Sequence, residues 1–166
     1  SGISQITKFD AAALQSRIAG ELKDFMPEVF LPAKDILRLD PFVHYAAAAA
    51  LMACEDAGLL SQELRVRSQE LNPPYPPFAK GGINTELLPI NSKLDSAGII
   101  IGSSRGGITS MEKALERYLL NGKPFSAYLM SASTINMASA YISMKLGIKG
   151  PALGISTACA SATNAI

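Results

Sequence analysis

One cysteine near the end of the sequence has neighbours that would make it a nucleophile. Cys159 follows an apolar run over residues 152–156 and a turn of small residues, and small residues continue after it. We expect a strand, a tight turn and a helix that begins near Cys159, where free N–H groups and the helix dipole favour thiolate over thiol. Small side chains at Ala158, Ala160 and Ser161 would admit a substrate carbonyl, whose oxyanion the Cys159 N–H could bind. The spacing alone is equally typical of a small buried hydrophobic residue, as free cysteines commonly are.

The elements expected around Cys159 alternate between strand and helix. The short runs 97–102 and 152–156 are apolar throughout, like strands in the interior of a sheet. Such strands, separated by helices, are typical of a parallel or mixed sheet that helices cover on both faces, so we predict a layered α/β fold. Helices are predicted over residues 40–58, 108–120 and 136–146.

The helix predicted over residues 40–58 has signals at both ends. Asp40 is a capping acceptor, Pro41 fits the first helical position, and Gly58 supplies a left-handed stop. By contrast, residues 61–96 contain five prolines and a Gly-Gly pair and follow neither a helical nor a strand period. We predict a Pro/Gly-rich insertion or long loop there.

Composition excludes several classes of protein. Fifteen Lys and Arg against 14 Asp and Glu, with no basic cluster, argue against nucleic-acid binding and give no reason for membrane attachment. The longest apolar run, residues 45–54, is far shorter than the roughly 18 to 20 residues that cross a bilayer. Two cysteines without a CxxC pattern argue against a disulfide scaffold or a structural zinc site, so a cytoplasmic location is expected.

The sequence lacks an initial Met and ends in a helical pattern without a stop signal, so we expect a piece of a longer chain.

The segment GIKGPALGISTACASATNAI, residues 147–166, resembles the active-site cysteine segment of the β-ketoacyl-acyl-carrier-protein synthases. These are the elongating condensing enzymes of fatty-acid and polyketide synthesis. The blocks SGISQITKFDAAALQSRIAGELKDF, RLDPFVHYAAAAALMACEDAGL, AGIIIGSSRGG and STINMASAYISMKLGIKGP also resemble that family, in the same order. Several collinear blocks are far more specific than a lone motif. Only residues 61–96 lack a clear counterpart.

The resemblance implies a thiolase-like fold with α-β-α-β-α layers, usually as a homodimer. Residues 1–166 would form most of its first half, truncated at both ends. Cys159 would be the acyl acceptor, which takes the acyl group from an acyl-carrier protein. A malonyl-carrier protein would then lose carbon dioxide and attack the acyl-enzyme, in a decarboxylative Claisen condensation that gives a 3-oxoacyl product. No metal or cofactor is implied, and because the family's catalytic histidines and lysine lie in the second half, these residues alone should be inactive.

Three residues are candidates for lining the acyl pocket by the same resemblance: Arg105, Met130 and Ser133. Arg105 stands where the family commonly has an apolar residue, which implies a shorter pocket, a polar acyl group, or a side chain turned to a carboxylate across the subunit interface. Its loop fits neither phosphate-binding pattern, GxGxxG or GxxxxGK(S/T), so nucleotide binding is not favoured. Met130 and Ser133 fit a pocket or the core, and we favour the core.

The remaining candidates have structural explanations. His44 matches no catalytic position of the family and is expected to be a packed or interfacial helix residue. Cys54, among Ala and Met, is expected to be inert core. The small residues Ala138, Ser139 and Ser143 of the helix predicted over 136–146 weakly favour a dimer.

Two alternatives to the elongating enzyme stay open. A non-catalytic partner subunit would keep the fold but typically replaces the cysteine, which is present here. A thiolase or starter-unit condensing enzyme would use coenzyme A thioesters, although the opening block and the GIKGP spacing look more like the elongating group.

Overall fold

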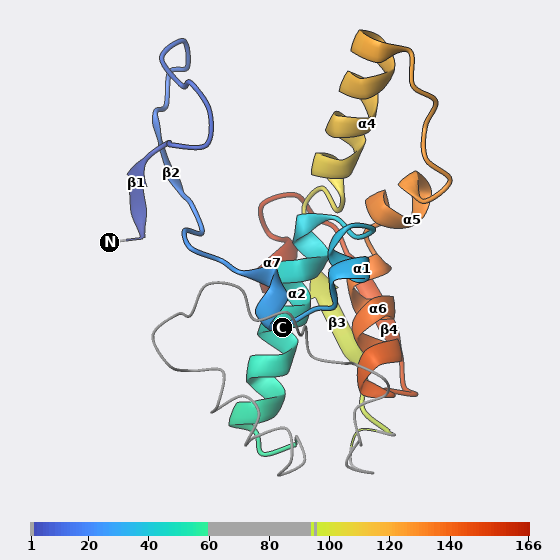
Figure 1. Cartoon of the computed structure of the whole chain (residues 1–166). Coiled ribbons are helices and arrows are strands. Elements are labelled where there is room, and N and C mark those ends of the chain that lie inside the picture. Colours follow the sequence, from blue (N-terminus) through green and yellow to red (C-terminus); the bar gives the residue numbers. More distant parts are fainter. Residues whose placement is uncertain (1, 60–93, 95) are drawn as a thin grey trace.

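The computed structural model describes residues 2–59, 94 and 96–166, so the insertion predicted over 61–96 lies, apart from Leu94 and Ser96, outside the described residues. The predicted helices and strands of the rest are all present, with ends shifted by at most two residues, except at the last helix (Figure 1). Their order is β1 (Ile3–Gln5), β2 (Ile18–Gly20), a 3-10 turn η1 (Pro27–Val29), α1 (Ala33–Ile36), α2 (Pro41–Asp56), β3 (Ile99–Gly102), α4 (Ile108–Asn121), α5 (Leu129–Ser133), α6 (Met137–Leu146), β4 (Ala152–Ile155) and α7 (Ser161–Asn164).

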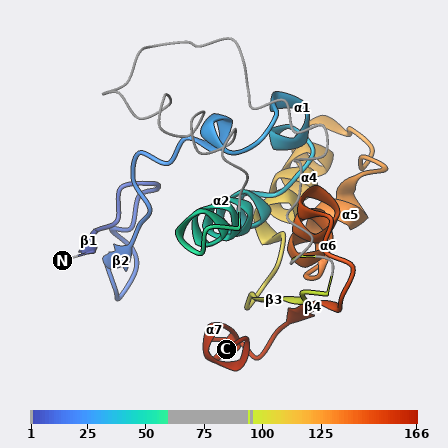
Figure 2. The same ribbon diagram turned by 90° about the horizontal axis from the view of Figure 1, so that it is seen from below.

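The two apolar runs form a parallel pair of strands, as predicted. β3 pairs with β4 in the register Ile99↔Ala152 to Gly102↔Ile155. The chain crosses between them through α4, α5 and α6, and α6 packs on both strands. Figure 2 shows α2 and α6 on one side of the strands and α7 on the other. Helices on both sides of a parallel pair confirm the α/β class.

The core lies between α2, α6 and the inner face of the strands. α2 is rich in alanine, so α6 approaches it closely, and Val43, Ala47, Ala138 and Ile142 are buried there. Small side chains on one helix let a neighbouring helix pack at short range. Ala138 and Ser139 are both fully buried inside the chain, so of the three small residues that favoured a dimer only the half-buried Ser143 keeps exposed surface.

Asp40 joins the start of α2 to the start of α4. Its carboxylate accepts from the backbone N–H of Phe42 (3.1 Å), as predicted, and also from that of Ser110 (2.6 Å). The second bond serves α4, whose own cap residue, Gly107, has no side chain to accept a bond. One buried carboxylate thus satisfies free N–H groups of two helices, which helps fix α4 against the body of the molecule. Gly58, at φ +66°, ends α2 in the left-handed conformation, as predicted.

An antiparallel hairpin, β1 and β2, stands apart from the helices (Figure 1). The sequence analysis did not predict these three-residue strands. Glu21 closes the hairpin by accepting from the backbone N–H groups of Thr7 and Lys8 and from the Thr7 hydroxyl. The hydroxyl bond from Thr7 is the main reason why the pKa of Glu21 is lowered.

The strands are not covered along their whole length. Ile100 and Leu153 are cross-strand neighbours, and they are 45% and 50% exposed. Both strands were expected to be buried on both faces. Within the described residues, α7 reaches the Gly102 end of β3 but is a single turn, so the rest of that face stays open.

Candidate active site

Cys159 lies just beyond the carboxyl end of β4, on an exposed turn. The predicted order of strand, turn and helix is present: α7 begins at Ser161, two residues after Cys159, and is four residues long. The prediction of a helix that begins near Cys159 is therefore confirmed, although this helix is a single turn. Its exposure also argues against the alternative that Cys159 is a small buried hydrophobic residue.

The turn that carries Cys159 has an unusual backbone conformation. Ala158 adopts φ +51°, in the left-handed region that residues with a Cβ seldom occupy. Ser161, buried among its neighbours, accepts from the backbone N–H of Thr157 (2.9 Å) and donates to the carbonyl of Ala158 (2.6 Å). The Asn164 amide donates to the Thr157 hydroxyl at 2.7 Å. The residues before Cys159 are thus tied to α7 behind it.

Gly102 lets this turn lie against the sheet. A Cβ at position 102 would overlap the backbone carbonyl of Ser161. Because a backbone atom cannot move aside as a flexible side chain can, glycine is required for this close approach.

The loop after β3 lies beside the turn after β4. Ser103 donates its N–H to the carbonyl of Ile155 (3.0 Å), and the Ser156 hydroxyl donates to the carbonyl of Ser104 (3.3 Å). Both loops leave the carboxyl ends of parallel strands, where open α/β sheets commonly bind ligands. The sequence-predicted residues Arg105 and Cys159 therefore belong to two loops at the same edge of the sheet.

Ser133 joins this edge through its backbone. The N–H of Gly107 donates to its carbonyl at 3.1 Å, and Gly106, at φ +60°, packs against the same segment. Arg105 is exposed and forms no ion pair with a described residue. Met130 is 72% exposed, so the interpretation that it belongs to the core is wrong. Ser133 is half-buried.

His44 and Cys54 lie on α2 and have the structural roles expected of them. His44 is buried, its Nε2 has no hydrogen-bond partner among the described residues, and burial lowers its pKa. Cys54 is half-buried against the core, and burial raises the pKa of its thiol, which makes it a poorer nucleophile.

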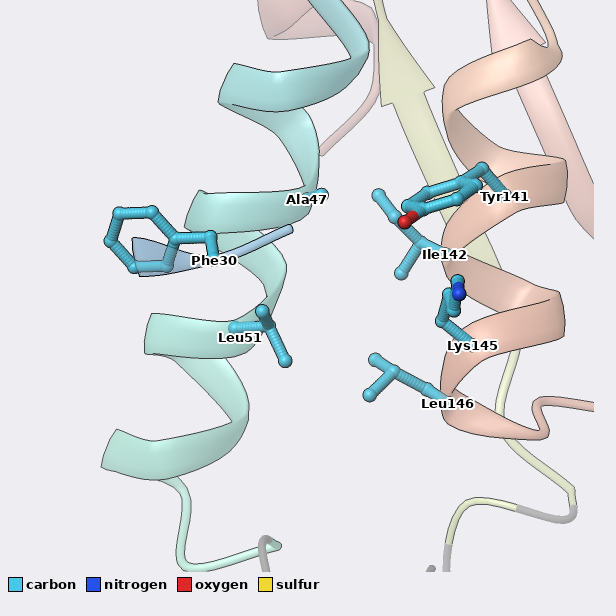
Figure 3. Close-up of a pocket in the computed structure, with 7 residues that line it drawn as sticks. All are labelled: Phe30, Ala47, Leu51, Tyr141, Ile142, Lys145 and Leu146. Atoms are coloured by element: carbon cyan, nitrogen blue, oxygen red, sulfur yellow. The ribbon is translucent and has the colours of Figure 1, made fainter. Parts of the chain in front are cut away.

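A small cavity between α2 and α6 is not part of this site. Its volume is about 20 Å³, which is room for about one water molecule. Beside it, the Tyr141 hydroxyl donates to Asp35 (2.8 Å), which also pairs with Lys145 (3.1 Å). These contacts tie α1 to α6. The residues around the cavity, drawn in Figure 3, are mostly apolar: Phe30, Ala47, Leu51, Tyr141, Ile142, Lys145 and Leu146.

Sequence reasoning found Cys159 but not the residues that hold it. Ser161 was noted only as a small neighbour, and Asn164 was not noted. The signal that could have found them is their spacing: Ser161 and Asn164 are polar residues four and seven positions after Thr157, and one turn of helix brings such residues back toward the preceding loop.

In the described part of the chain, no group of three or more His, Cys, Asp or Glu side chains is placed to hold a metal ion.

Comparison with known proteins identifies the family. The sequence model described as "Beta-ketoacyl synthase, N-terminal domain" matches residues 78–166, which include the Cys159 turn and both strands. The chain belongs to the β-ketoacyl synthase family. The family resemblance of the sequence is thereby confirmed.

Curated relatives of this β-ketoacyl synthase chain match nearly all of it. The 3-oxoacyl-acyl-carrier-protein synthase 2 of Coxiella burnetii is 34% identical over 96% of this chain and 32% of its own length. The chloroplastic synthase II of Arabidopsis thaliana is 33% identical over 97% of this chain and 25% of its own. The chain thus spans about a third or less of the length of these relatives.

Solved structures show the same fold. A β-ketoacyl synthase from Burkholderia phymatum superposes with a TM-score of 0.61 at 20% identity, over 98% of this chain and 34% of the other. The ishigamide ketosynthase/chain length factor gives a TM-score of 0.58 at 23% identity, over 95% of this chain and 32% of the other.

No helix in the described part of this chain is both long enough and apolar enough to cross a membrane.

Proposed function

We propose that this chain is the nucleophile-bearing part of a 3-oxoacyl-acyl-carrier-protein synthase and that Cys159 holds the acyl group. The position of Cys159 carries the proposal. Its exposed side chain follows the carboxyl end of β4, on a turn fixed by Ser161, within the segment that matches the family.

In the first step the Cys159 thiolate attacks the thioester of an acyl-acyl-carrier protein. A bond forms between Cys159 Sγ and the carbonyl carbon, and the bond from that carbon to the carrier sulfur breaks. The carrier thiolate takes up the proton that Cys159 released. The backbone N–H of Cys159 helps to stabilise the oxyanion of the intermediate.

In the second step a malonyl-acyl-carrier protein loses carbon dioxide. The electron pair of the broken C–C bond attacks the carbonyl of the acyl-enzyme, and the Cys159 sulfur leaves as thiolate. The product is a 3-oxoacyl thioester two carbons longer. Since carbon dioxide release and the thioester supply the driving force, the proposal includes no metal or redox cofactor.

Groups that assist decarboxylation must come from elsewhere in the full-length protein. His44, the single histidine of the sequence, is buried on α2 and has no described contact with the Cys159 turn. We therefore assign the complete reaction to the full-length enzyme.

The proposed fold around the site has thiolase-like α-β-α-β-α layers, of which residues 1–166 supply most of the first half. Helices on both sides of β3 and β4 support it, as do the open apolar side chains of Ile100 and Leu153. Another layer packed on these side chains would remove them from water.

The acyl pocket is proposed at the edge that holds Cys159. Arg105 and Ser133 belong to segments packed around Gly106 and Gly107 at this edge, and the exposed Met130 lies on the same short helix as Ser133. A cation at Arg105 favours a short or polar acyl group over a long saturated chain.

The proposed partners are acyl- and malonyl-loaded acyl-carrier protein and a second copy of the chain. The outward surface of α4 supports the homodimer, since no residue of α4 is buried and several of its large apolar side chains are exposed. A non-catalytic partner subunit is the weaker alternative, because such a subunit needs no exposed cysteine at this position.

The test is product formation by the full-length protein. With an octanoyl-acyl-carrier protein and a malonyl-acyl-carrier protein, we expect a 3-oxodecanoyl thioester, and Cys159→Ala should lower the rate by about 10³-fold or more. Cys54→Ala is the matched control and should keep the wild-type rate. Product from octanoyl-coenzyme A but not from the carrier-bound substrate would instead identify a starter-unit enzyme, and no product from either would favour the non-catalytic subunit.

A further inference from the structure

We propose that Ser161 is a positioning residue for Cys159: its hydroxyl holds Ala158 in the left-handed conformation that aims the sulfur at the substrate carbonyl. The inference rests on the proposed function of Cys159 as the acyl acceptor. It concerns a residue that reaches the reacting sulfur only through the backbone.

The Ser161 hydroxyl bridges the two residues that precede Cys159. It accepts from the N–H of Thr157 at 2.9 Å and donates to the carbonyl of Ala158 at 2.6 Å. The bond to Ala158 is short and the bond from Thr157 is of ordinary length, and Ser161 is only 3% exposed, so water cannot readily replace its hydroxyl. The two bonds hold the peptide group before Thr157 and the peptide group after Ala158, and so restrain the backbone dihedral angles of the two residues between them.

Ala158 needs such support. It is one of two non-glycine residues with positive φ in the described part of the chain, and its Cβ disfavours that conformation. Without the hydroxyl, the Ala158 carbonyl keeps only the bond from the Ser161 backbone N–H (3.2 Å) and the Thr157 N–H loses its bond to Ser161, so the turn can relax toward ordinary φ values. Since Ala158 directly precedes Cys159, relaxation there redirects the Cys159 Cα–Cβ bond.

The backbone of Ser161 packs against β3. Its backbone lies so close to Gly102 of β3 that a Cβ there would overlap the Ser161 carbonyl. The hydroxyl therefore acts from a fixed point on the sheet and connects β3 to the nucleophile turn.

The orientation of the Cys159 sulfur matters more for attack on a carrier-bound thioester than for reaction with a small reagent that can approach from many directions. Attack on a carrier-bound thioester requires the sulfur at a defined distance and direction, and a misplacement of about 1 Å can cost about 10²-fold. Alkylation by iodoacetamide depends chiefly on thiolate fraction and exposure. The two reactions therefore separate orientation from reactivity.

The experiment measures both reactions on Cys159 in the full-length protein. Acylation by octanoyl-acyl-carrier protein and alkylation by iodoacetamide are followed by intact mass and peptide mapping. For Ser161→Ala we expect acylation about tenfold slower and alkylation within about twofold of wild type. Ser139→Ala, which removes another buried hydroxyl bonded to a backbone carbonyl (Asn136, 2.9 Å), is the matched control and should change neither.

A double-mutant cycle tests the link to Ala158. Glycine adopts positive φ about as readily as negative φ, so Ala158→Gly removes the need for support. In that background, Ser161→Ala should slow acylation by less than about threefold. Equal effects in both backgrounds would overturn the proposal.

Other outcomes are equally decisive. Acylation of the Ser161→Ala variant within twofold of wild type would overturn the positioning role. Acylation and alkylation that fall together with the melting temperature would assign Ser161 to folding alone, and would overturn it too. Wild-type protein that is alkylated but never acylated would refute the proposed function itself, and with it the role of Ser161.

Discussion

At the scale of single residues, His44 shows how a group that suggests catalysis acts on stability instead. Burial lowers its pKa below the ordinary value of 6.5, with Asp40 opposing the effect, so the folded chain takes up the His44 proton at a lower pH than the unfolded chain does. As the pH falls below 6.5 the unfolded state therefore binds more protons at this residue than the folded state. Stability is therefore lost as the pH falls through this range, at no more than about 1.4 kcal/mol per pH unit.

The comparison of His44→Gln with wild type isolates this contribution. Melting temperatures between pH 7.5 and 5 should fall more steeply for wild type than for the variant. Asp35 does not titrate in this pH range. Burial raises its pKa, but hydrogen bonds from Tyr141 and Lys145 outweigh burial, so the pKa is lowered overall. The contribution of Asp35 to the free energy of unfolding is therefore lost only below about pH 4. Parallel curves for the two proteins would show that His44 does not carry the effect.

At the scale of elements, Asp40 is expected to be worth more than an ordinary helix cap. Asp40→Ala leaves the N–H groups of Phe42 and Ser110 without their acceptor and should lower the free energy of unfolding by about 2 to 3 kcal/mol. Asp40→Asn, which keeps one acceptor oxygen, should lose about half of that. Urea unfolding measures both, with the exposed Asp56→Ala as a control expected to stay within about 0.5 kcal/mol of wild type. A similar small change for Asp40→Ala would contradict the double cap.

Gly102 connects two elements, β3 and α7. Gly102→Ala should push the Ser161 carbonyl away from the strand, which lowers the melting temperature and slows acylation of Cys159 by about tenfold or more. Gly20→Ala is the control, because its new Cβ would meet only an ordinary contact of 3.8 Å in the hairpin. Wild-type acylation of the Gly102→Ala variant would mean that the turn does not depend on this close approach.

The sequence predicted the elements better than their contacts. β3, β4, α2, α4 and α6 have strong local signals in their apolar runs, caps and glycine stops. The hairpin strands are three residues long, too short to show a period, and depend on Glu21, which is at least 13 residues from the groups it binds.

The contacts around the site depend on residues far apart in the sequence. Asp40 reaches Ser110 across 70 residues, and Gly102 meets Ser161 across the crossover between strands. No local pattern encodes such pairs. The resemblance to a family identified Cys159, whereas the hydroxyl that supports its turn required coordinates.

At the scale of the whole molecule, the apolar surface of α4 predicts self-association. Leu119 is 70% exposed and shares α4 with the exposed Leu115. We expect the full-length protein to be a dimer by light scattering and Leu119→Glu to weaken it by about tenfold or more, since a charge placed in an apolar interface is costly. Leu37→Glu, at an 88% exposed leucine next to α1, should leave the dimer intact. A Leu119→Glu variant that stays as dimeric as wild type would place the interface elsewhere.

The central claim is that Cys159 carries the acyl group, and the mass of the acylated protein tests it most directly. The full-length protein, incubated with octanoyl-acyl-carrier protein alone, should gain the mass of one octanoyl group, mapped to the peptide that contains Cys159 and lost on later addition of malonyl-acyl-carrier protein. Cys159→Ala should gain no such mass, whereas Cys54→Ala should behave as wild type, because burial leaves Cys54 a poor nucleophile. An unmodified wild-type protein, or label shared equally between Cys159 and Cys54, would contradict the claim.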